Sequence, residues 1–383
     1  MKKKRIAMIL PTIPQLGGAH QYASLVMECL VENQGLEYDL VAICNTPFWR
    51  KWCRKNGISC IEIRIPELSD LEKSFNNIFP FLAKIFYSYF TSMGKLLNEK
   101  KIDIIFSTSQ GVFIPNYNVK KIVPVHDLMH RYERRFPEVS EEYEQREVIM
   151  KSFAKYADCI LVDSKLGKKQ FIESYIKRYK GKPYIVSLPF IAPEHIYNRK
   201  EEYISVPDRY VFYPAQFWKH KNHINLIKAI ALLRDDIDDI HLVLVGSEKN
   251  CCKEIKKYIL DNGLESNITI LGFVSDENIS YLYNHAVAMI MPSYFGPTNI
   301  PPLEAMALGC PVAVSNKYAM PEQVGDAGLL FDPDSPEEIS ECIKKLWLNE
   351  DLCEKMKLLG YKRSNMWTKK DFSKRLKKII KSV

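Results

Sequence analysis

The sequence lacks the patterns that mark several common kinds of protein. Its 10 cysteines form no C-x-x-C pair and show no metal-site spacing, so neither a zinc module nor a disulfide framework is expected. No run reaches the roughly 20 apolar residues that a membrane-spanning helix needs. The first apolar run, Ile6–Leu10, stops at Pro11 and is too short for a signal peptide, so it predicts a strand. Together these absences favour a cytoplasmic protein with reduced thiols.

Low-complexity segments are also absent. The 383 residues are 46% hydrophobic and 26% charged, which is ordinary for a folded chain long enough for about two domains. Lysine and arginine exceed aspartate and glutamate, 54 against 46, which gives a formal net charge of +8. This balance fits a slightly basic cytosolic protein, and it also fits attraction to phosphorylated substrates, anionic lipid or nucleic acid.

Short apolar runs alternate with helix-period segments along most of the chain. The runs are rich in Ile and Val and show little polar alternation, which is typical of strands buried on both faces of a parallel sheet. A polar stretch with several prolines, Pro189–Pro207, interrupts the rhythm, which then starts again. We therefore predict an α/β protein with two tandem Rossmann-like domains, residues 1–190 and 191–366, facing each other across a cleft. Ligands are expected at the strand-to-helix loops.

The C-terminal segment, residues 367–383, has the pattern of a basic amphipathic helix. Its lysines and arginine alternate with four apolar residues: Phe372, Leu376, Ile379 and Ile380. Such a helix can lie on an anionic membrane, and it can equally pack back onto the first domain. The stretch Phe75–Phe90 is too aromatic for a solvated face and is a candidate for acceptor contacts. Nucleic acid is not expected, because the basic residues do not interleave with aromatics in a groove-like pattern.

The segment Met291–Val312 carries the strongest signal. A buried strand ends at Met291, a loop with Gly, Pro and Asn follows, and Pro301 or Pro302 opens a helix. A loop that feeds a helix N-terminus presents free backbone N–H groups and the positive end of the helix dipole, which suits a diphosphate. Glu304 is expected in the first turn, where its carboxylate can accept hydrogen bonds from a ribose diol or can cap the helix.

The residues P-P-L-E-A-M-A-L-G-C-P-V, which begin at Pro301, resemble the nucleotide-binding signature of retaining glycosyltransferases of family 4, which have the GT-B fold. Members of that family usually read E-G-F-G-L-P-x-L-E-A-M-A-x-G-x-P-V. The resemblance covers nearly the whole chain. It continues in the same order and spacing at Gly17 and Gly18, His126 and Asp127, Val162–Lys165, and Lys221 and Asn222.

Two departures from the family pattern concern the donor sugar. Counting back from Glu304, the family's first glutamate, which contacts donor sugar hydroxyls, falls at Gly296. The chain reads G-P-T-N over 296–299 and resembles a G-P-T-N subgroup. Gln216 stands where many members carry an arginine, five residues before Lys221. The resemblance therefore implies an intact nucleotide site and leaves the donor sugar open.

The resemblance assigns roles that the chemistry of the residues permits. Lys221 would stabilise the diphosphate leaving group by its charge, with Lys219 and His220 as close alternatives in the same loop. His126 would sit beside the donor sugar, where it could exchange a proton. The predicted catalytic residues are His126, Lys221 and Glu304. The predicted donor-binding residues are Gly17, Gly18, Gln216, Lys221, Gly246, Ser247, Phe273, Val274, Thr298, Asn299, Ile300 and Glu304.

Two further motifs, a D-x-D pattern and a glycine-containing loop, do not have the function that such motifs often have. Asp332 and Asp334 match the D-x-D pattern of metal-dependent glycosyltransferases, but they precede Ser335 at an evident helix start, which predicts capping. The loop before the first helix is not G-x-G-x-x-G, and the second strand ends at Asn45 without an acidic residue, which argues against a nicotinamide dehydrogenase. We predict no metal and no cofactor.

The predicted function is transfer of a glycosyl unit from a nucleoside-diphosphate sugar to a hydroxyl of a glycan or lipid-linked glycan, as in surface polysaccharide biosynthesis. This is a hexosyltransferase-like activity of class EC 2.4. The resemblance implies retention of the anomeric configuration. Gly296 keeps a catalytically degenerate nucleotide-sugar-binding protein open as an alternative, and a nucleotide-sugar epimerase is another. Peripheral contact with an anionic membrane at its inner face is the expected location if the basic C-terminal segment binds lipid.

Overall fold

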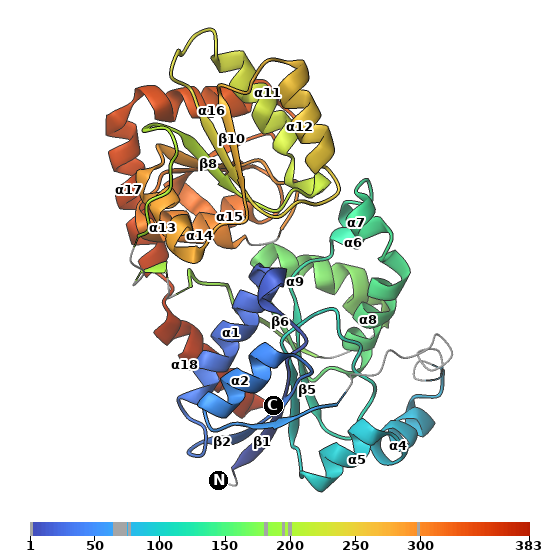
Figure 1. Ribbon diagram of the computed structural model, residues 1–383. Helices are drawn as coiled ribbons and strands as arrows, with labels where there is room; N and C mark the ends of the chain where they lie inside the picture. The colour runs from blue at the N-terminus through green and yellow to red at the C-terminus, as the bar shows by residue number, and fades with distance from the viewer. Residues whose placement is uncertain are drawn as a thin grey trace. The chain divides into compact units, whose positions relative to one another are not determined.

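The computed structural model describes residues 3–63, 75, 78–179, 183–193, 196–197, 201–296 and 299–383 (Figure 1). The chain forms two compact units. Unit 1 contains Met1–Tyr132, Val139–Phe190 and Lys369–Val383, and unit 2 contains Glu133–Glu138 and Ile191–Thr368. A short piece from the first half of the sequence thus belongs to unit 2, and the C-terminal segment belongs to unit 1.

Unit 1 is built on a parallel sheet of 7 strands. Its strands are β1 (Lys4–Ile9), β2 (Tyr38–Ile43), β3 (Ser59–Ile61), β4 (Ile104–Ser107), β5 (Lys120–Val125), β6 (Cys159–Val162) and β7 (Tyr184–Ser187). They lie in the order β3-β2-β1-β4-β5-β6-β7. In the middle of the sheet, Ile6 lies between Leu40 and Ile104, and all three side chains are buried. Burial on both faces explains why these runs are apolar throughout.

The helices of unit 1 include one irregular segment. The helical segment Lys165–Tyr179 contains a π-helical turn, Ile172–Ile176, which carries Tyr175 toward the buried carboxylate of Glu147. The helices are α1 (Gly18–Val31), α2 (Pro47–Lys55), α4 (Pro80–Phe90), α5 (Ser92–Glu99), α6 (Met129–Tyr132), α8 (Tyr143–Tyr156), α9 (Lys165–Phe171), α10 (Lys177–Tyr179) and α18 (Lys369–Ser382). A further short helix, α7 (Pro137–Ser140), spans a boundary between the units.

The aromatic stretch forms α4, and much of it is exposed. Phe81 and Phe90 are 74% and 68% exposed, whereas Ala83 and Tyr87 face the core of unit 1. In the part of the chain that the structure covers, no helix is both long enough and apolar enough to span a bilayer.

The C-terminal helix α18 packs lengthwise against α1 (Figure 1). Its apolar residues Phe372, Leu376, Ile379 and Ile380 are all buried. Its lysines form ion pairs with acidic residues on or just after α1: Lys369 with Glu28 at 3.1 Å and Lys381 with Glu37 at 2.9 Å. Of the two interpretations of this segment, packing onto the first domain accounts for its apolar face.

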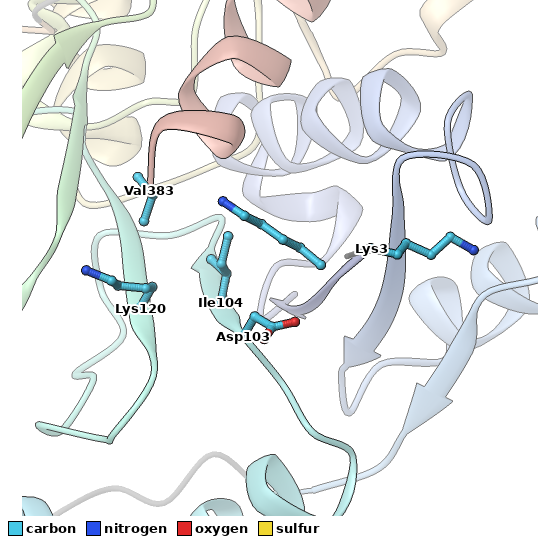
Figure 2. Close-up of a pocket in the computed structure, with 6 residues that line it drawn as sticks. Lys3, Asp103, Ile104, Lys120 and Val383 are labelled. Carbon is cyan, nitrogen blue, oxygen red and sulfur yellow. The ribbon is translucent and has the colours of Figure 1, made fainter. Parts of the chain in front are cut away.

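A cavity of about 320 Å³ opens where the N-terminal ends of the unit 1 strands meet the end of α18 (Figure 2). It is lined by Lys3, Lys4, Asp103, Ile104, Lys120 and Val383. The lysines are already engaged by Asp39, the carbonyl oxygen of Ile380 and Asp158. Because open α/β sheets bind ligands at the opposite, carboxyl ends of their strands, this cavity is not a candidate site.

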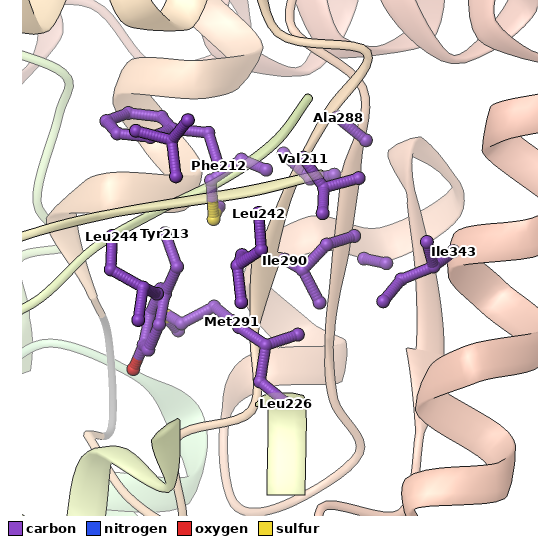
Figure 3. Close-up of a cluster of buried hydrophobic side chains, with 14 of the residues drawn as sticks. Val211, Phe212, Tyr213, Leu226, Leu242, Leu244, Ala288, Ile290, Met291 and Ile343 are labelled. Carbon is purple, nitrogen blue, oxygen red and sulfur yellow. The ribbon is translucent and has the colours of Figure 1, made fainter. Parts of the chain in front are cut away.

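Unit 2 has a second parallel sheet, of 6 strands. Its strands are β8 (Val211–Pro214), β9 (Leu242–Val245), β10 (Ile268–Gly272), β11 (Ala288–Met291), β12 (Val312–Ser315) and β13 (Gly328–Phe331). They lie in the order β10-β9-β8-β11-β12-β13. Figure 3 shows the core beside this sheet, where side chains of β8, β9 and β11 meet Leu226 and Ile343 from helices. A doubly wound domain of this kind presents its loops at one edge of the sheet.

The helices of unit 2 are α11 (His223–Leu233), α12 (Cys252–Asp261), α13 (Asp276–His285), α14 (Ile300–Leu308), α15 (Met320–Val324), α16 (Pro336–Leu348) and α17 (Glu350–Asn365). A 3₁₀ turn, η4 (Lys219–Lys221), precedes α11. The start of α14 differs from the prediction, because the helix begins at Ile300 and both Pro301 and Pro302 lie in its first turn. It ends at Gly309, whose left-handed φ of 74° a glycine adopts without strain.

Replacing a buried residue of α18 tests its packing. Leu376→Ala removes a fully buried side chain and is expected to lower the stability of the protein by about 2–5 kcal/mol, because a cavity remains. Denaturant unfolding followed by circular dichroism measures the change, with Lys378→Ala on the exposed face as the control. Equal midpoints for the two variants would show that α18 does not pack on unit 1 in solution.

Candidate functional site

The predicted site residues fall into two groups, one in each unit. In unit 1 the loop after β1 reaches α1 through Gly17, whose φ is 59°, and Gly18 is the first residue of the helix. His126 directly follows β5. Tyr22, one turn into α1, packs edge-on against the imidazole of His126 with ring centroids 4.6 Å apart. The structure thus brings His126 and the start of α1 together.

The polar contacts of His126 leave one ring nitrogen unused. Nδ1 of His126 lies 3.4 Å from Oδ1 of Asp163, and the backbone N–H donates to Oε1 of Gln110 at 2.7 Å. Nε2 of His126 is buried and makes no hydrogen bond to any residue that the structure describes, and the same holds for the hydroxyl of Tyr22. Buried polar atoms without partners are rare, so this pair marks a place where a bound group can complete the bonding.

In unit 2, Lys221 ends the η4 turn after β8. The next residue, Asn222, has a left-handed φ of 59°, and its amide donates to the carbonyls of Pro292 and Pro333 at 3.1 and 2.7 Å, which fixes the loop. Burial lowers the pKa of Lys221 to about 8. Among the described residues, the ammonium contacts the amide oxygen of Asn299 and makes no ion pair. Lys221 is half-buried, and a partly desolvated cation without a counter-ion is unfavourable, so this position favours an anionic ligand.

Asn299 links Lys221 to the loop after β11. Its Oδ1 accepts a hydrogen bond from the ammonium of Lys221 at 3.3 Å. Its backbone N–H donates to Oε1 of Gln323 at 2.9 Å, and the Gln323 amide donates back to its carbonyl. Gly296 has a φ of 127°, and a Cβ there would lie 2.3 Å from Nδ2 of Asn299. The Asn299 side chain therefore occupies the space that the family's glutamate at this position would need.

Glu304 is held by a neighbouring helix. It lies beyond the first turn of α14, not within it as predicted, because the helix starts earlier at Ile300. Its Oε2 accepts from the hydroxyl of Tyr283 in α13 at 2.9 Å, and the residue is 7% exposed. The sequence pattern gave no indication of Tyr283. A carboxylate has several lone pairs, so this contact orients the group and still allows further bonds to its oxygens.

The start of α14 offers fewer amide donors than the loop-to-helix pattern predicts. Pro301 and Pro302 carry no N–H, and the N–H of Asn299 is taken by Gln323. Among the residues at the helix start, Ile300 and Leu303 remain as possible backbone N–H donors. Any anion at this helix end therefore depends more on the Lys221 ammonium than on backbone N–H groups.

The loop after β9 packs closely on the loop after β8. Gly246 has a φ of 153°, and a Cβ there would lie 2.2 Å from the carbonyl oxygen of Ala215. The carbonyl of Ser247 accepts the backbone N–H of Phe217 at 3.1 Å. Gln216 lies between Ala215 and Phe217 in the sequence, and its Oε1 accepts from the indole N–H of Trp218 at 2.9 Å. These contacts place Gln216, Gly246 and Ser247 at one end of the sheet, beside the η4 turn.

Two predicted residues follow β10, and two others, Asn299 and Ile300, are the N-cap and the first residue of α14. Phe273 is 84% exposed, which leaves its ring open for stacking, and Val274 packs against the core of unit 2. Ile300 is the first residue of α14 and is buried. Thr298 lies outside the described residues.

The predicted capping role of Asp332 and Asp334 is wrong. Ser335 caps α16, since its hydroxyl accepts from the N–H of Glu338 at 3.1 Å. Asp332 instead forms an ion pair with Lys317 at 3.1 Å, and Asp334 accepts a hydrogen bond from the hydroxyl of Tyr294. Over the described ranges, no group of 3 or more His, Cys, Asp or Glu side chains is placed to hold a metal ion.

The architecture defines the class of protein first. The solved structure of Alr3699/HepE from Anabaena, in complex with UDP and glucose, aligns with 99% of this chain and 100% of that chain. The TM-score is 0.73 at 15% sequence identity, a level at which the likeness shows the fold. The two Rossmann-like parallel-sheet units are therefore those of the GT-B fold of glycosyltransferases.

The sequence comparisons add what unit 2 is similar to. Residues 197–363 match the model of glycosyl transferases group 1. O-antigen chain mannosyltransferase B of Escherichia coli is 33% identical over 132 residues, which cover 34% of this chain and 35% of that protein. Serotype-specific mannosyltransferase WbdA of Escherichia coli is 26% identical over 267 residues, 66% of this chain and 32% of that protein. The matches thus span about a third of each relative's length, and they support a glycosyltransferase.

Replacing the half-buried cation is expected to stabilise the free protein. Lys221→Met removes a charge that burial destabilises, so the thermal midpoint should rise by roughly 2–4 °C. Differential scanning calorimetry at pH 7 measures the shift, with Lys219→Met, an exposed lysine of the same turn, as the matched control. A lower midpoint for Lys221→Met would mean that the ammonium is satisfied in the free protein.

Proposed function

We propose that the chain is a glycosyltransferase that moves a mannosyl unit from a nucleoside-diphosphate sugar to a hydroxyl group of a glycan. The group 1 match over unit 2 supports the activity, and the names of the two mannosyltransferase relatives support the sugar. The GT-B neighbour from Anabaena was solved with UDP and glucose, which supports a nucleotide-sugar donor.

The observation that carries the proposal is the half-buried ammonium of Lys221 beside Asn299 and the start of α14. A diphosphate gains negative charge as the bond to the sugar breaks, so a fixed cation stabilises the transition state more than the ground state. The low polarity of the site strengthens this attraction. Lys221 performs, in this proposal, the task that a metal ion performs in other transferases.

The remaining residues of unit 2 bind the rest of the donor. The carboxylate of Glu304, oriented by Tyr283, accepts hydrogen bonds from the ribose hydroxyls. The loops with Gly246 and Ser247, and with Phe273 and Val274, hold ribose and base. Gln216, Asn299 and Ile300 contact the diphosphate and the sugar, and Thr298 is proposed to do the same.

Transfer proceeds with retention in this proposal. The bond between the anomeric carbon and the diphosphate oxygen breaks, the acceptor oxygen bonds to the same carbon on the same face, and its proton passes to a diphosphate oxygen. His126 contacts the donor sugar through its unused Nε2, and Gly17 and Gly18 offer backbone contacts in unit 1. NMR of the product tests this step, since an inverted linkage contradicts it.

A donor screen tests the function as a whole. Thermal shifts are measured with UDP-, GDP-, ADP- and dTDP-sugars, because a ligand that binds the folded state raises its apparent stability. The selected donor is then incubated with glycan acceptors in the presence of a metal chelator. Turnover under these conditions supports the proposal. Interconversion of donors without an acceptor identifies an epimerase, and binding without turnover identifies a degenerate enzyme.

The pH dependence of donor binding follows from Lys221. Its pKa of about 8 means that the free protein loses this positive charge as the pH rises above about 8. The Kd for the donor is therefore expected to stay flat below pH 8 and to rise by up to about 10-fold per pH unit above it. Isothermal titration calorimetry from pH 6.5 to 9.5 measures this. The Kd of Lys219→Met should rise with pH as in the wild type, and the Kd of Lys221→Met should not depend on pH above 8. The same pH dependence in both variants would contradict the assignment of this titration to Lys221.

The exposed face of α4 fits a membrane-bound acceptor. Phe81 and Phe90 are exposed, and α4 contains Lys84 and no acidic residue, so an anionic lipid surface at the cytoplasmic side suits it. The double variant Phe81→Glu with Phe90→Glu is expected to lose at least about 10-fold in affinity for phosphatidylglycerol vesicles in a sedimentation assay. Leu358→Glu, an equally exposed position of unit 2, is the control. Equal binding by all three proteins would exclude α4 from membrane contact.

A further inference from the structure

A short segment from the first half of the sequence is part of unit 2. We call Glu133–Glu138 the strap. It runs from the residue after α6 to the second residue of α7, and it groups with unit 2 although its neighbours on both sides group with unit 1. The strap contacts the loops that follow β8, β9, β11, β12 and β13. These are the loops at the carboxyl ends of the unit 2 strands, where the candidate donor site lies.

Glu138 holds the η4 turn that carries Lys221. One carboxylate oxygen accepts both the backbone N–H of His220 at 3.0 Å and its ring Nδ1 at 2.6 Å, and the other accepts the amide of Asn250 at 3.0 Å. The Glu138 side chain is 7% exposed. Burial raises the pKa of Glu138, but the bonds from His220 and Asn250 outweigh it and bring the pKa to about 2. The carboxylate is therefore charged and fully engaged at neutral pH.

Two neighbouring strap residues hold the loop after β11. The ring of Phe136 packs against Tyr294 and Phe295, with centroids 5.2 and 5.8 Å away. The guanidinium of Arg135 lies 4.1 Å from the centroid of the Tyr294 ring and 3.6 Å from Oδ1 of Asp334, in the loop after β13. Contacts of these kinds add to the burial of the rings.

The strap also connects the two loops to each other and to the loop after β12. The imidazole of His220 stacks on Phe295 with centroids 4.0 Å apart, so the residue before Lys221 meets the residue before Gly296. Glu133 accepts a hydrogen bond from the hydroxyl of Tyr318 at 2.7 Å. The strap residue Phe136 lies beside both rings of this stack, with its centroid 6.3 Å from that of His220 and 5.8 Å from that of Phe295.

We propose that the strap sets the positions of the η4 turn and the β11 loop, and that Glu138 is a positioning residue for the Lys221 ammonium. The effect on catalysis that we expect from this positioning rests on the proposed function. A buried carboxylate is tolerated when charged donors or N–H groups surround it, so the loop conformation that presents both donors of His220 to Glu138 is the stabilised one. In that conformation Lys221 reaches Asn299. Without the Glu138 charge, the turn loses the ion pair and the backbone hydrogen bond that His220 makes with Glu138.

The experiment compares Glu138→Gln with the wild type and with Glu141→Gln, an exposed glutamate nearby for which no contact is seen. Hydrogen exchange of the free protein is expected to be at least 10-fold faster in peptides covering 216–222 and 292–296 for Glu138→Gln only. Donor kinetics with GDP-mannose and, separately, UDP-glucose are expected to show KM for the donor raised about 10-fold, with KM for the acceptor unchanged. A merely structural defect lowers the folded fraction and therefore kcat, at an unchanged donor KM.

The two readouts separate the proposals. If the wild type binds neither nucleotide sugar, the proposed function fails, and hydrogen exchange alone decides whether the strap orders the loops. Exchange equal to that of Glu141→Gln overturns the strap proposal, as does a fall in kcat alone. Tyr318→Phe, which removes a single bond to Glu133, is the second variant if Glu138→Gln does not fold; faster exchange confined to unit 2 loops supports the strap, and unchanged exchange overturns it.

Discussion

Partly burying an ammonium without a carboxylate partner is unfavourable, and the surroundings of Lys221 show how this fold maintains such a group. The turn that carries Lys221 is anchored by Asn222, whose amide bonds to two carbonyls from neighbouring loops. The ammonium itself meets only the amide dipole of Asn299 among the described residues, which orients it without neutralising it. A charge that the protein leaves uncompensated is available to a ligand of opposite charge.

The sequence predicts the central strands of the two sheets well because these strands are buried on both faces, whereas the edge strands β3, β7, β10 and β13 are only partly buried. The first apolar run, Ile6–Leu10, falls on β1, and the strand predicted to end at Met291 is β11. The start of α14 was placed too late, since a proline pattern indicates a first turn and not its first residue. The basic amphipathic pattern of 367–383 allowed two interpretations, membrane binding and packing onto the first domain. Leu376 is buried because α18 packs on α1, and the local sequence does not show that these two helices meet.

The supporting contacts of the site could not be predicted, because they join residues far apart in the chain. Lys221 and Asn299 are 78 positions apart, and Glu138 and His220 are 82 positions apart. Tyr283 lies in a helix that carries no recognisable motif, and only the fold brings its hydroxyl to Glu304. Periodicity reports which face of an element is buried, and a family signature reports which residues recur, but neither reports which side chain restrains another.

A side chain at position 296 would occupy the same space as the side chain of Asn299. This limits which substitutions the chain can accept at these two positions. Any Cβ at 296 would overlap the Asn299 amide, and the backbone there has a φ of 127° that other residues rarely adopt. A glutamate at 296 would thus require a smaller residue at 299 and a different course of the loop at the same time. The two positions are expected to be inherited as a pair, so relatives that recover the glutamate without also replacing the asparagine should be rare.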